Sequence, residues 1–188
     1  MTTPKLIGLT GLAGVGKDTV AACLNMHHGF WPIALADPIR AMLEALLEDV
    51  QAPLEYIHAR ELKERAIPGL GLSYRRLAQT LGTEWGRQTL GGNLWLDIAH
   101  KKVDAIQRGD THGGVVITDV RFNNEAEWIH TMGGQVWRIH RHSAAPVRPH
   151  ASENGIPAGL VNVDIYNNGS IAELQQQVAH LVASIQTS

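Results

Sequence analysis

The sequence predicts an α/β fold in three layers, with a mostly parallel β-sheet covered by helices. Two observations carry this prediction. Short apolar runs alternate with helical stretches four or five times along the chain, and no segment repeats another. The first apolar run ends directly in glycines, as a buried parallel strand does where it enters a ligand-binding turn. The chain of 188 residues suits one folding unit with appended segments.

The first part of the chain predicts two strands, each followed by a helix. Residues 6–9 form the first apolar run, and a helix should begin at Lys17, after the glycines. Residues 31–36 predict the second strand. Asp37 and Pro38 then supply an N-cap and a proline at the first helical position, before apolar residues with three- and four-residue spacing.

The middle of the chain departs from this alternation. Between about 51 and 71 the composition turns polar and ends in Pro-Gly-Leu-Gly, which indicates an excursion from the core layers. Helical periodicity returns at 73–81 and 95–107. The next run, 115–119, is almost purely β-branched, so we expect it to be the central strand.

The last part of the chain again predicts helices between strands. A helix over 123–132 is stopped by two glycines and leads to a strand at 135–139. An ordered loop is expected over 141–157, followed by a last strand at 161–165. The final helix begins with a Ser-Ile-Ala-Glu capping box at 170–173. In such a sheet, ligands bind at the carboxyl ends of the strands.

Composition and charge exclude several classes of protein. The 16 Lys and Arg residues against 18 Asp and Glu lack the basic excess of a protein that binds polymeric nucleic acid. The single cysteine excludes internal disulfides and suits a reducing compartment, so we expect a cytoplasmic protein. No apolar run approaches the ~20 residues of a membrane span, and the N-terminus lacks a signal-peptide pattern. We therefore expect no membrane association.

A glycine-rich segment, Gly-Leu-Ala-Gly-Val-Gly-Lys-Asp-Thr at 11–19, fits the phosphate-loop pattern GxxxxGK between a predicted strand and a predicted helix. Glycines let successive backbone N–H groups face one anion, and the helix N-terminus adds its positive dipole. Lys17 would bridge the β- and γ-phosphates of ATP. The alternative is a glycine-rich turn that merely ends in lysine. The expected nucleotide-binding residues here are Gly11, Ala13, Gly14, Val15, Gly16, Lys17, Asp18 and Thr19.

Asp18 departs from the general phosphate-loop pattern, which has Ser or Thr at this position as a ligand for Mg²⁺. A carboxylate beside a triphosphate is unfavourable unless a cation lies between them, which indicates Asp18 as a metal-binding residue. Alternatively, Asp18 only favours the positive helix N-terminus while Thr19 serves the metal.

Five further segments carry distinctive motifs. They are the tripeptide Ala-Asp-Pro at 36–38, and the segments RLAQTLGTEWGR at 76–87, DVRFNNEA at 119–126, HASE at 150–153 and DIYNNG at 164–169. Together with Gly-Lys-Asp-Thr, these segments resemble the phage-type deoxynucleoside monophosphate kinases, and they extend over most of the chain. The likeness to adenylate, thymidylate and dephospho-coenzyme A kinases is weaker. Phosphomevalonate kinases of the animal type share the Gly-Lys-Asp loop, so that loop alone does not identify the acceptor.

The resemblance implies a P-loop kinase domain over 1–188, with an acceptor-binding helical excursion at about 38–95 and a lid-like loop at about 140–158. It implies transfer of the γ-phosphate of ATP, with Mg²⁺, to a deoxynucleoside monophosphate. A homodimer is possible, and a phage-encoded enzyme would act in the host cytoplasm.

Arginines are the expected ligands of an acceptor phosphate, because they bind it in bidentate geometry. Arg76 and Arg87 lie on one predicted segment, where Gln79 or Glu84 would read a base edge. A solvated amphipathic helix is the alternative. With the resemblance, the expected acceptor-site residues are Asp37, Arg76, Gln79, Thr83, Glu84, Arg87 and Arg121.

Asp119 and Arg121 follow the β-branched strand and should emerge beside the phosphate loop. There Asp119 would orient a magnesium-bound water or contact the acceptor, and we expect it to be catalytic together with Lys17. Alternatively, Asp119 caps the following turn and Arg121 pairs with Glu125.

The resemblance also implies a catalytic arginine in the lid, and Arg141 is the first candidate, ahead of Arg138 and Arg148. It places Asn167 near the adenine ring, although Asn-Asn-Gly is also a plain turn. Trp85 is the one tryptophan whose neighbours suggest base stacking. Two other functions remain open: a kinase for a different small phosphorylated metabolite, and a nucleotide-binding switch.

Overall fold

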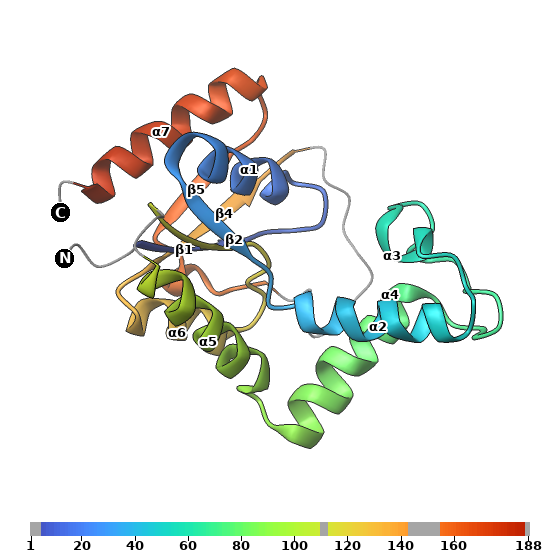
Figure 1. Cartoon of the computed structure of the whole chain (residues 1–188). Helices are drawn as coiled ribbons and strands as arrows, with labels where there is room; N and C mark the ends of the chain where they lie inside the picture. Colours follow the sequence, from blue (N-terminus) through green and yellow to red (C-terminus); the bar gives the residue numbers. More distant parts are fainter. Residues whose placement is uncertain (1–4, 110–112, 143–154, 187–188) are drawn as a thin grey trace. The chain divides into compact units, whose positions relative to one another are not determined.

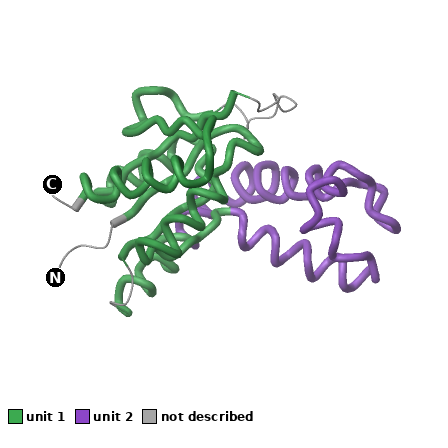
Figure 2. Tube along the Cα trace, turned by 90° about the horizontal axis from the view of Figure 1, so that it is seen from above, with its two compact units in different colours: residues 1–35, 99–188 green, residues 36–98 purple. Residues whose placement is uncertain are grey.

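The computed structural model describes residues 5–109, 113–142 and 155–186. The chain divides into two compact units, coloured separately in Figure 2. Unit 1 combines residues 1–35 with residues 99–188, and unit 2 is the continuous stretch 36–98. Unit 2 spans the excursion expected at about 38–95. Most of the expected lid, including Arg148 and the HASE motif, lies outside the described residues.

Unit 1 is built on a five-stranded sheet among the described residues, and every pairing in it is parallel. The strand order is β2-β3-β1-β4-β5. The strands are β1 Lys5–Thr10, β2 Phe30–Ile33, β3 Gly114–Ile117, β4 Gln135–His140 and β5 Val163–Tyr166. The predicted α/β class is confirmed. The prediction of the central strand is wrong, because β1 is the middle strand and β3 lies between β1 and β2.

Helices cover both faces of the sheet in unit 1. Helices α1 (Lys17–His28) and α7 (Ile171–Gln186) lie on one side, and α6 (Asn123–Thr131) lies on the other (Figure 1). The core beneath α1 and α7 centres on Trp137, which is fully buried. Alternate residues of β4 therefore face this core, which leaves Arg138 and His140 on the opposite face.

Unit 2 is helical, and it has its own apolar core. It contains α2 (Asp37–Asp49), α3 (Glu55–His58), α4 (Tyr74–Gln79) and η1 (Thr80–Leu90). Helix α5 (Leu94–Arg108) begins in unit 2 and ends in unit 1. The core of unit 2 consists of Ile39, Leu43, Leu47, Ala52, Ile57, Ile67 and Trp95.

Segment η1 is a π-helix that directly continues α4, so the helical stretch predicted at 73–81 ends too early. Two buried glycines explain the difference. The Trp95 indole Nε1–H donates to the carbonyl of Gly82 (2.8 Å), and a Cβ at Gly86 would lie 2.3 Å from the Trp95 ring. Glycine weakens an isolated helix, but here it lets a tryptophan of the core reach the helix backbone.

The predicted helix starts have different outcomes. In helix α2 the cap residue is Ala36, and Asp37 is the first helical residue, so the N-cap expected at Asp37 is wrong. The Asp37 carboxylate instead accepts a hydrogen bond from the Arg40 guanidinium (3.1 Å). The capping box of α7 is confirmed. The backbone N–H of Ser170 donates to the Glu173 carboxylate (2.6 Å), and the N–H of Glu173 donates to Ser170 Oγ (3.3 Å). No helix in the described ranges is both long and apolar enough to cross a membrane.

Candidate active site

The glycine-rich loop connects the end of β1 at Thr10 to the start of α1 at Lys17. Gly11, Gly14 and Gly16 have φ values of 134°, 81° and 104°, which residues with a Cβ rarely adopt. A Cβ at Gly11 would also lie 2.4 Å from the carbonyl oxygen of Ile139. The loop thus has the strand-loop-helix context that the phosphate-loop motif requires.

Lys17 lies against its own loop. Its Nζ donates to the carbonyl oxygens of Gly11 (2.7 Å) and Leu12 (2.9 Å). These bonds hold the ammonium group at the mouth of the loop, where phosphate oxygens can replace the carbonyls as acceptors.

Asn167, which follows β5, also contacts the loop. Its side-chain amide donates to the carbonyl of Val15 (2.8 Å), and its backbone N–H donates to the carbonyl of His140 (2.8 Å). A Cβ at Gly16 would lie 2.3 Å from this amide nitrogen. The position near the adenine ring that the sequence resemblance implied stays a prediction, and the structure shows that the Asn167 side chain contacts the phosphate loop.

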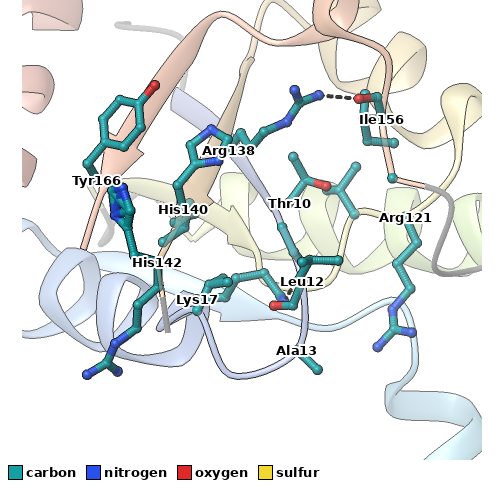
Figure 3. A pocket seen from close by; sticks show the side chains of 16 residues that line it. Thr10, Leu12, Ala13, Lys17, Arg121, Arg138, His140, His142, Ile156 and Tyr166 are labelled. Carbon is teal, nitrogen blue, oxygen red and sulfur yellow. Dashed lines mark hydrogen bonds between the residues drawn. The ribbon is translucent and has the colours of Figure 1, made fainter. Parts of the chain in front are cut away.

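A cavity of ≈ 460 Å³ opens beside the loop in unit 1 (Figure 3). Four cationic side chains line it, those of Lys17, Arg121, Arg138 and Arg141, and no Asp or Glu is among the described lining residues. A cavity with this charge is suited to a polyanion. Of the predicted site residues, Gly11, Ala13, Val15, Lys17, Arg121 and Arg141 line it.

Sequence reasoning missed several lining residues. Arg138 was a secondary candidate; it lines the cavity and donates to the carbonyl of Ile156. His140 and Tyr166 also line the cavity, with stacked rings 5.0 Å apart. The available signal was positional, because β4 and β5 end at the same carboxyl edge of the sheet as β1.

Arg121 is held by a buried carboxylate. Glu125, which is 2% exposed, accepts hydrogen bonds from the backbone N–H groups of Arg121 (2.6 Å) and Phe122 (3.0 Å). The alternative pairing of Arg121 with Glu125 therefore involves the backbone of Arg121, and the Arg121 side chain lines the cavity.

Asp119 lies two residues beyond the end of β3. Its carboxylate accepts a hydrogen bond from the backbone N–H of Leu35 (2.7 Å), just after β2. It is absent from the described lining of the cavity. The structure thus gives Asp119 a contact at the carboxyl edge of the sheet, and its catalytic role stays a prediction.

The predicted acceptor residues lie in unit 2, except Arg121. Arg76 Nη1 is 2.9 Å from the carboxylate of Glu84, so this segment brings these two residues together. Arg87 donates to the carbonyl of Gly92 (2.9 Å). Trp85 is 41% exposed and lies 6.5 Å from the buried ring of Trp95. Gln79 and Thr83 are half-buried on the same segment.

The donor set around the loop fits Mg²⁺. Asp18 and Thr19 are exposed in the first turn of α1. The described residues contain no group of three His, Cys, Asp or Glu side chains that could form a metal cage. Mg²⁺ beside a nucleotide needs only one or two protein oxygens, because phosphates and waters complete its octahedral shell.

A parallel sheet whose middle strand feeds a GxxxxGK loop, beside a cavity lined by lysine and arginines, defines a P-loop kinase. The sequence profile of the deoxynucleotide monophosphate kinases matches residues 52–178. This chain belongs to that family, as the sequence resemblance predicted.

Two curated relatives match almost the whole chain. A protein of Acanthamoeba polyphaga mimivirus, named "Putative deoxynucleotide monophosphate kinase", is 31% identical over 94% of this chain and 95% of its own length. The "Deoxynucleoside-5'-monophosphate kinase" of Escherichia phage T5 is 30% identical over 86% of this chain and 89% of its own length. A solved Thermus thermophilus protein, TT1252, shares the fold with a TM-score of 0.54 and 19% identity, over 97% and 98% of the two chains.

Proposed function

We propose that this protein transfers the γ-phosphate of ATP to a deoxynucleoside monophosphate and releases ADP and the deoxynucleoside diphosphate. The observation that carries this proposal is the cationic cavity on the phosphate loop, in a chain of the deoxynucleotide monophosphate kinase family. Phosphoryl transfer needs little covalent chemistry from the protein, which instead aligns two phosphates and stabilises charge on the moving group.

ATP is bound through the loop. The N–H groups of 11–16 and the N-terminus of α1 surround the β-phosphate, and Lys17 exchanges the carbonyls of Gly11 and Leu12 for β- and γ-phosphate oxygens. Asn167 supports the loop through a hydrogen bond to the carbonyl of Val15. This bond holds the backbone next to Gly16 in the loop conformation.

Asp18 would hold Mg²⁺ directly or through water, with Thr19 as the neighbouring oxygen donor. Mg²⁺ held there would supply positive charge that offsets the negative charge of the ATP phosphates. Asp18 is well placed for this, since it is exposed in the first turn of α1 next to Lys17.

The acceptor is bound by the side chains of unit 2. In the structure Arg76 is paired with Glu84, so a phosphate that binds Arg76 would release the Glu84 carboxylate. The released carboxylate is then an acceptor for an amino group on the edge of a base. Arg87 would add a second guanidinium, while Asp37, Gln79 and Thr83 complete the polar surface.

Arg138 and Arg141 stabilise the negative charge that spreads over the γ-phosphoryl group during transfer, and Arg121 would bind the acceptor phosphate. All three line the cavity with Lys17. Arg141 lies at the start of the segment that we propose as the lid, and Asp119 would orient the acceptor or a magnesium-bound water.

We further propose that the enzyme acts in the cytoplasm, or in the host cytoplasm if it is phage-encoded, and that it forms a homodimer. The chain has one cysteine, the buried Cys23, so it cannot form an internal disulfide, which suits a reducing compartment. Light scattering of the purified protein measures the oligomeric state.

A coupled assay of ADP release tests the function. Deoxy- and ribonucleoside monophosphates, dephospho-coenzyme A and phosphomevalonate are compared as acceptors, with an acceptor-free reaction as the reference. We expect turnover with deoxynucleoside monophosphates to exceed every other acceptor. Equal ADP release without any acceptor would instead favour a nucleotide switch, and preference for another metabolite would reassign the acceptor.

A further inference from the structure

Arg141 follows directly after β4, and both of its neighbours line the cavity. His140 is the last residue of β4, and His142 is the last described residue before 155. An exposed arginine has many rotamers, so its guanidinium is useful in catalysis only if the backbone that carries it is held in one orientation.

The end of β5 holds both neighbours of Arg141. The Nε2–H of His140 donates to the Asp164 carboxylate (2.6 Å), because a carboxylate is only an acceptor. The ring of Tyr166 stacks on His140 at 5.0 Å with planes 16° apart. On the other side of Arg141, the backbone N–H of His142 donates to Asn168 Oδ1 (2.9 Å).

These contacts go beyond what strand pairing requires. Pairing of β4 with β5 already aligns His140 with Tyr166 in register. His140 and Tyr166 line the cavity, and Figure 3 shows them across it from Arg121. Asp164 contacts His140 but is not among the described lining residues. The contacts therefore constrain the point where the chain leaves the sheet and carries Arg141.

We propose that His140, Asp164 and Tyr166 are positioning residues that orient Arg141 toward the transferred phosphoryl group. This inference rests on the proposed function, in which Arg141 stabilises the negative charge that develops on the γ-phosphoryl group during transfer. None of the three is assigned a contact with substrate. Their effect should appear in kcat, because a loosely held Arg141 loses alignment only in the transition state.

The first test compares Asp164→Ala with a matched control. His100 and Asp104 on α5 form a similar exposed pair at 3.5 Å, away from the cavity lining. We expect Asp164→Ala to lower kcat about three- to tenfold, with the acceptor KM unchanged, since misplacement of a catalytic group is costly. Asp104→Ala should leave kcat unchanged. Asp164→Asn keeps an acceptor for His140 and should restore most of the rate.

A double-mutant cycle then tests the route through Arg141. In an Arg141→Ala background, Asp164→Ala should produce no further fall in kcat, and Tyr166→Leu should behave in the same way. An equal fall in both backgrounds would overturn the proposal, as would full kcat in Asp164→Ala. If Asp164→Ala does not fold, Tyr166→Leu carries the same cycle.

The cycle also separates this inference from the proposed function. If Arg141→Ala keeps the wild-type kcat, the catalytic role of Arg141 is wrong and the positioning role falls with it. Phosphoryl transfer to a deoxynucleoside monophosphate would still be tested by the acceptor panel. If Arg141→Ala is slow but Asp164→Ala adds to it independently, only the positioning role is wrong.

Discussion

At the scale of single residues, the site is a set of cations held by backbone carbonyls, with one buried carboxylate, Glu125, that fixes the backbone beside them. Lys17 bonds two loop carbonyls, Arg138 bonds Ile156, and Glu125 fixes the backbone at Arg121. These contacts limit the orientations of each cation before a ligand arrives. Preorganised charge of this kind costs little reorganisation during the reaction.

Lys17→Ala should abolish activity without unfolding the protein. The side chain makes polar contacts within an open loop rather than core packing, so its loss removes charge from the γ-phosphate and little else. We expect kcat to fall by ~10²-fold or more, with the urea midpoint of unfolding unchanged. Lys101→Ala, at an exposed position of α5, is the control and should retain activity. A folded Lys17→Ala enzyme with wild-type turnover would reject the phosphate-loop assignment.

Gly16→Ala tests the support that Asn167 gives to the loop. Gly16 has a φ of 104°, and its Cβ would lie 2.3 Å from the Asn167 amide. We expect a loss of unfolding free energy of about 1–3 kcal/mol and weaker ATP binding, measured by calorimetry. Gly69→Ala has a comparable φ of 82° but open space around it, so it reports backbone strain alone. Equal losses in the two variants would show that the Asn167 contact has no role.

The loop residues 11–17 could be predicted from sequence because one local motif contains both the glycines and the lysine. The pairing of His140 with Asp164 could not, since it joins residues that meet only through the register of two parallel strands. Asp37 was expected to cap α2 and lies inside it, because the preceding Ala36 already occupies the cap position.

At the scale of elements, η1 shows how tertiary packing overrides local propensity. If intrinsic helix propensity alone decided its length, the helix would end near the glycines of the LGTEWGR motif. Burial of Trp95 against Gly82 and Gly86 instead carries the helix to Leu90. By contrast, helix α7 follows its local signal, because its capping box needs no distant partner.

Gly86→Ala should destabilise unit 2. The new methyl group would overlap the Trp95 ring, which is part of the core and cannot move aside. We expect a loss of about 1–3 kcal/mol in unfolding free energy, measured by urea denaturation. Gly92→Ala, where nothing lies within 4 Å, should change stability by less than ~0.5 kcal/mol. A stable Gly86→Ala variant would contradict the packing role of the glycine.

The capping box of α7 predicts a pH-dependent contribution to stability. Hydrogen bonds from the backbone N–H and the side chain of Ser170 lower the pKa of Glu173. The contribution is therefore present above the ordinary pKa of a glutamate and is lost as pH falls through the lowered value. We expect Glu173→Gln to have a lower Tm than wild type at neutral pH, and the difference should vanish in acid. Glu127→Gln, at an exposed position of α6, should show no such pH dependence.

At the scale of the whole molecule, the predicted site residues are distributed over the two units. Unit 1 contains the phosphate loop and the cationic cavity, while unit 2 contains Arg76, Glu84 and Arg87. The alternation of strands and helices made the sheet predictable from periodicity. In the sequence, unit 2 appears as a polar stretch with interrupted helices. Its compact core around Leu43 and Trp95 could not be predicted from this pattern, because that core joins segments that are distant in the sequence.

The central claim is that the γ-phosphate of ATP is transferred to a deoxynucleoside monophosphate. Its most direct test supplies ATP with a labelled γ-phosphate and each deoxynucleoside monophosphate in turn, then separates the products. The account predicts that the label appears in the deoxynucleoside diphosphate and that Lys17→Ala abolishes this product. Label found only in inorganic phosphate, with every deoxynucleoside monophosphate unchanged, would contradict it.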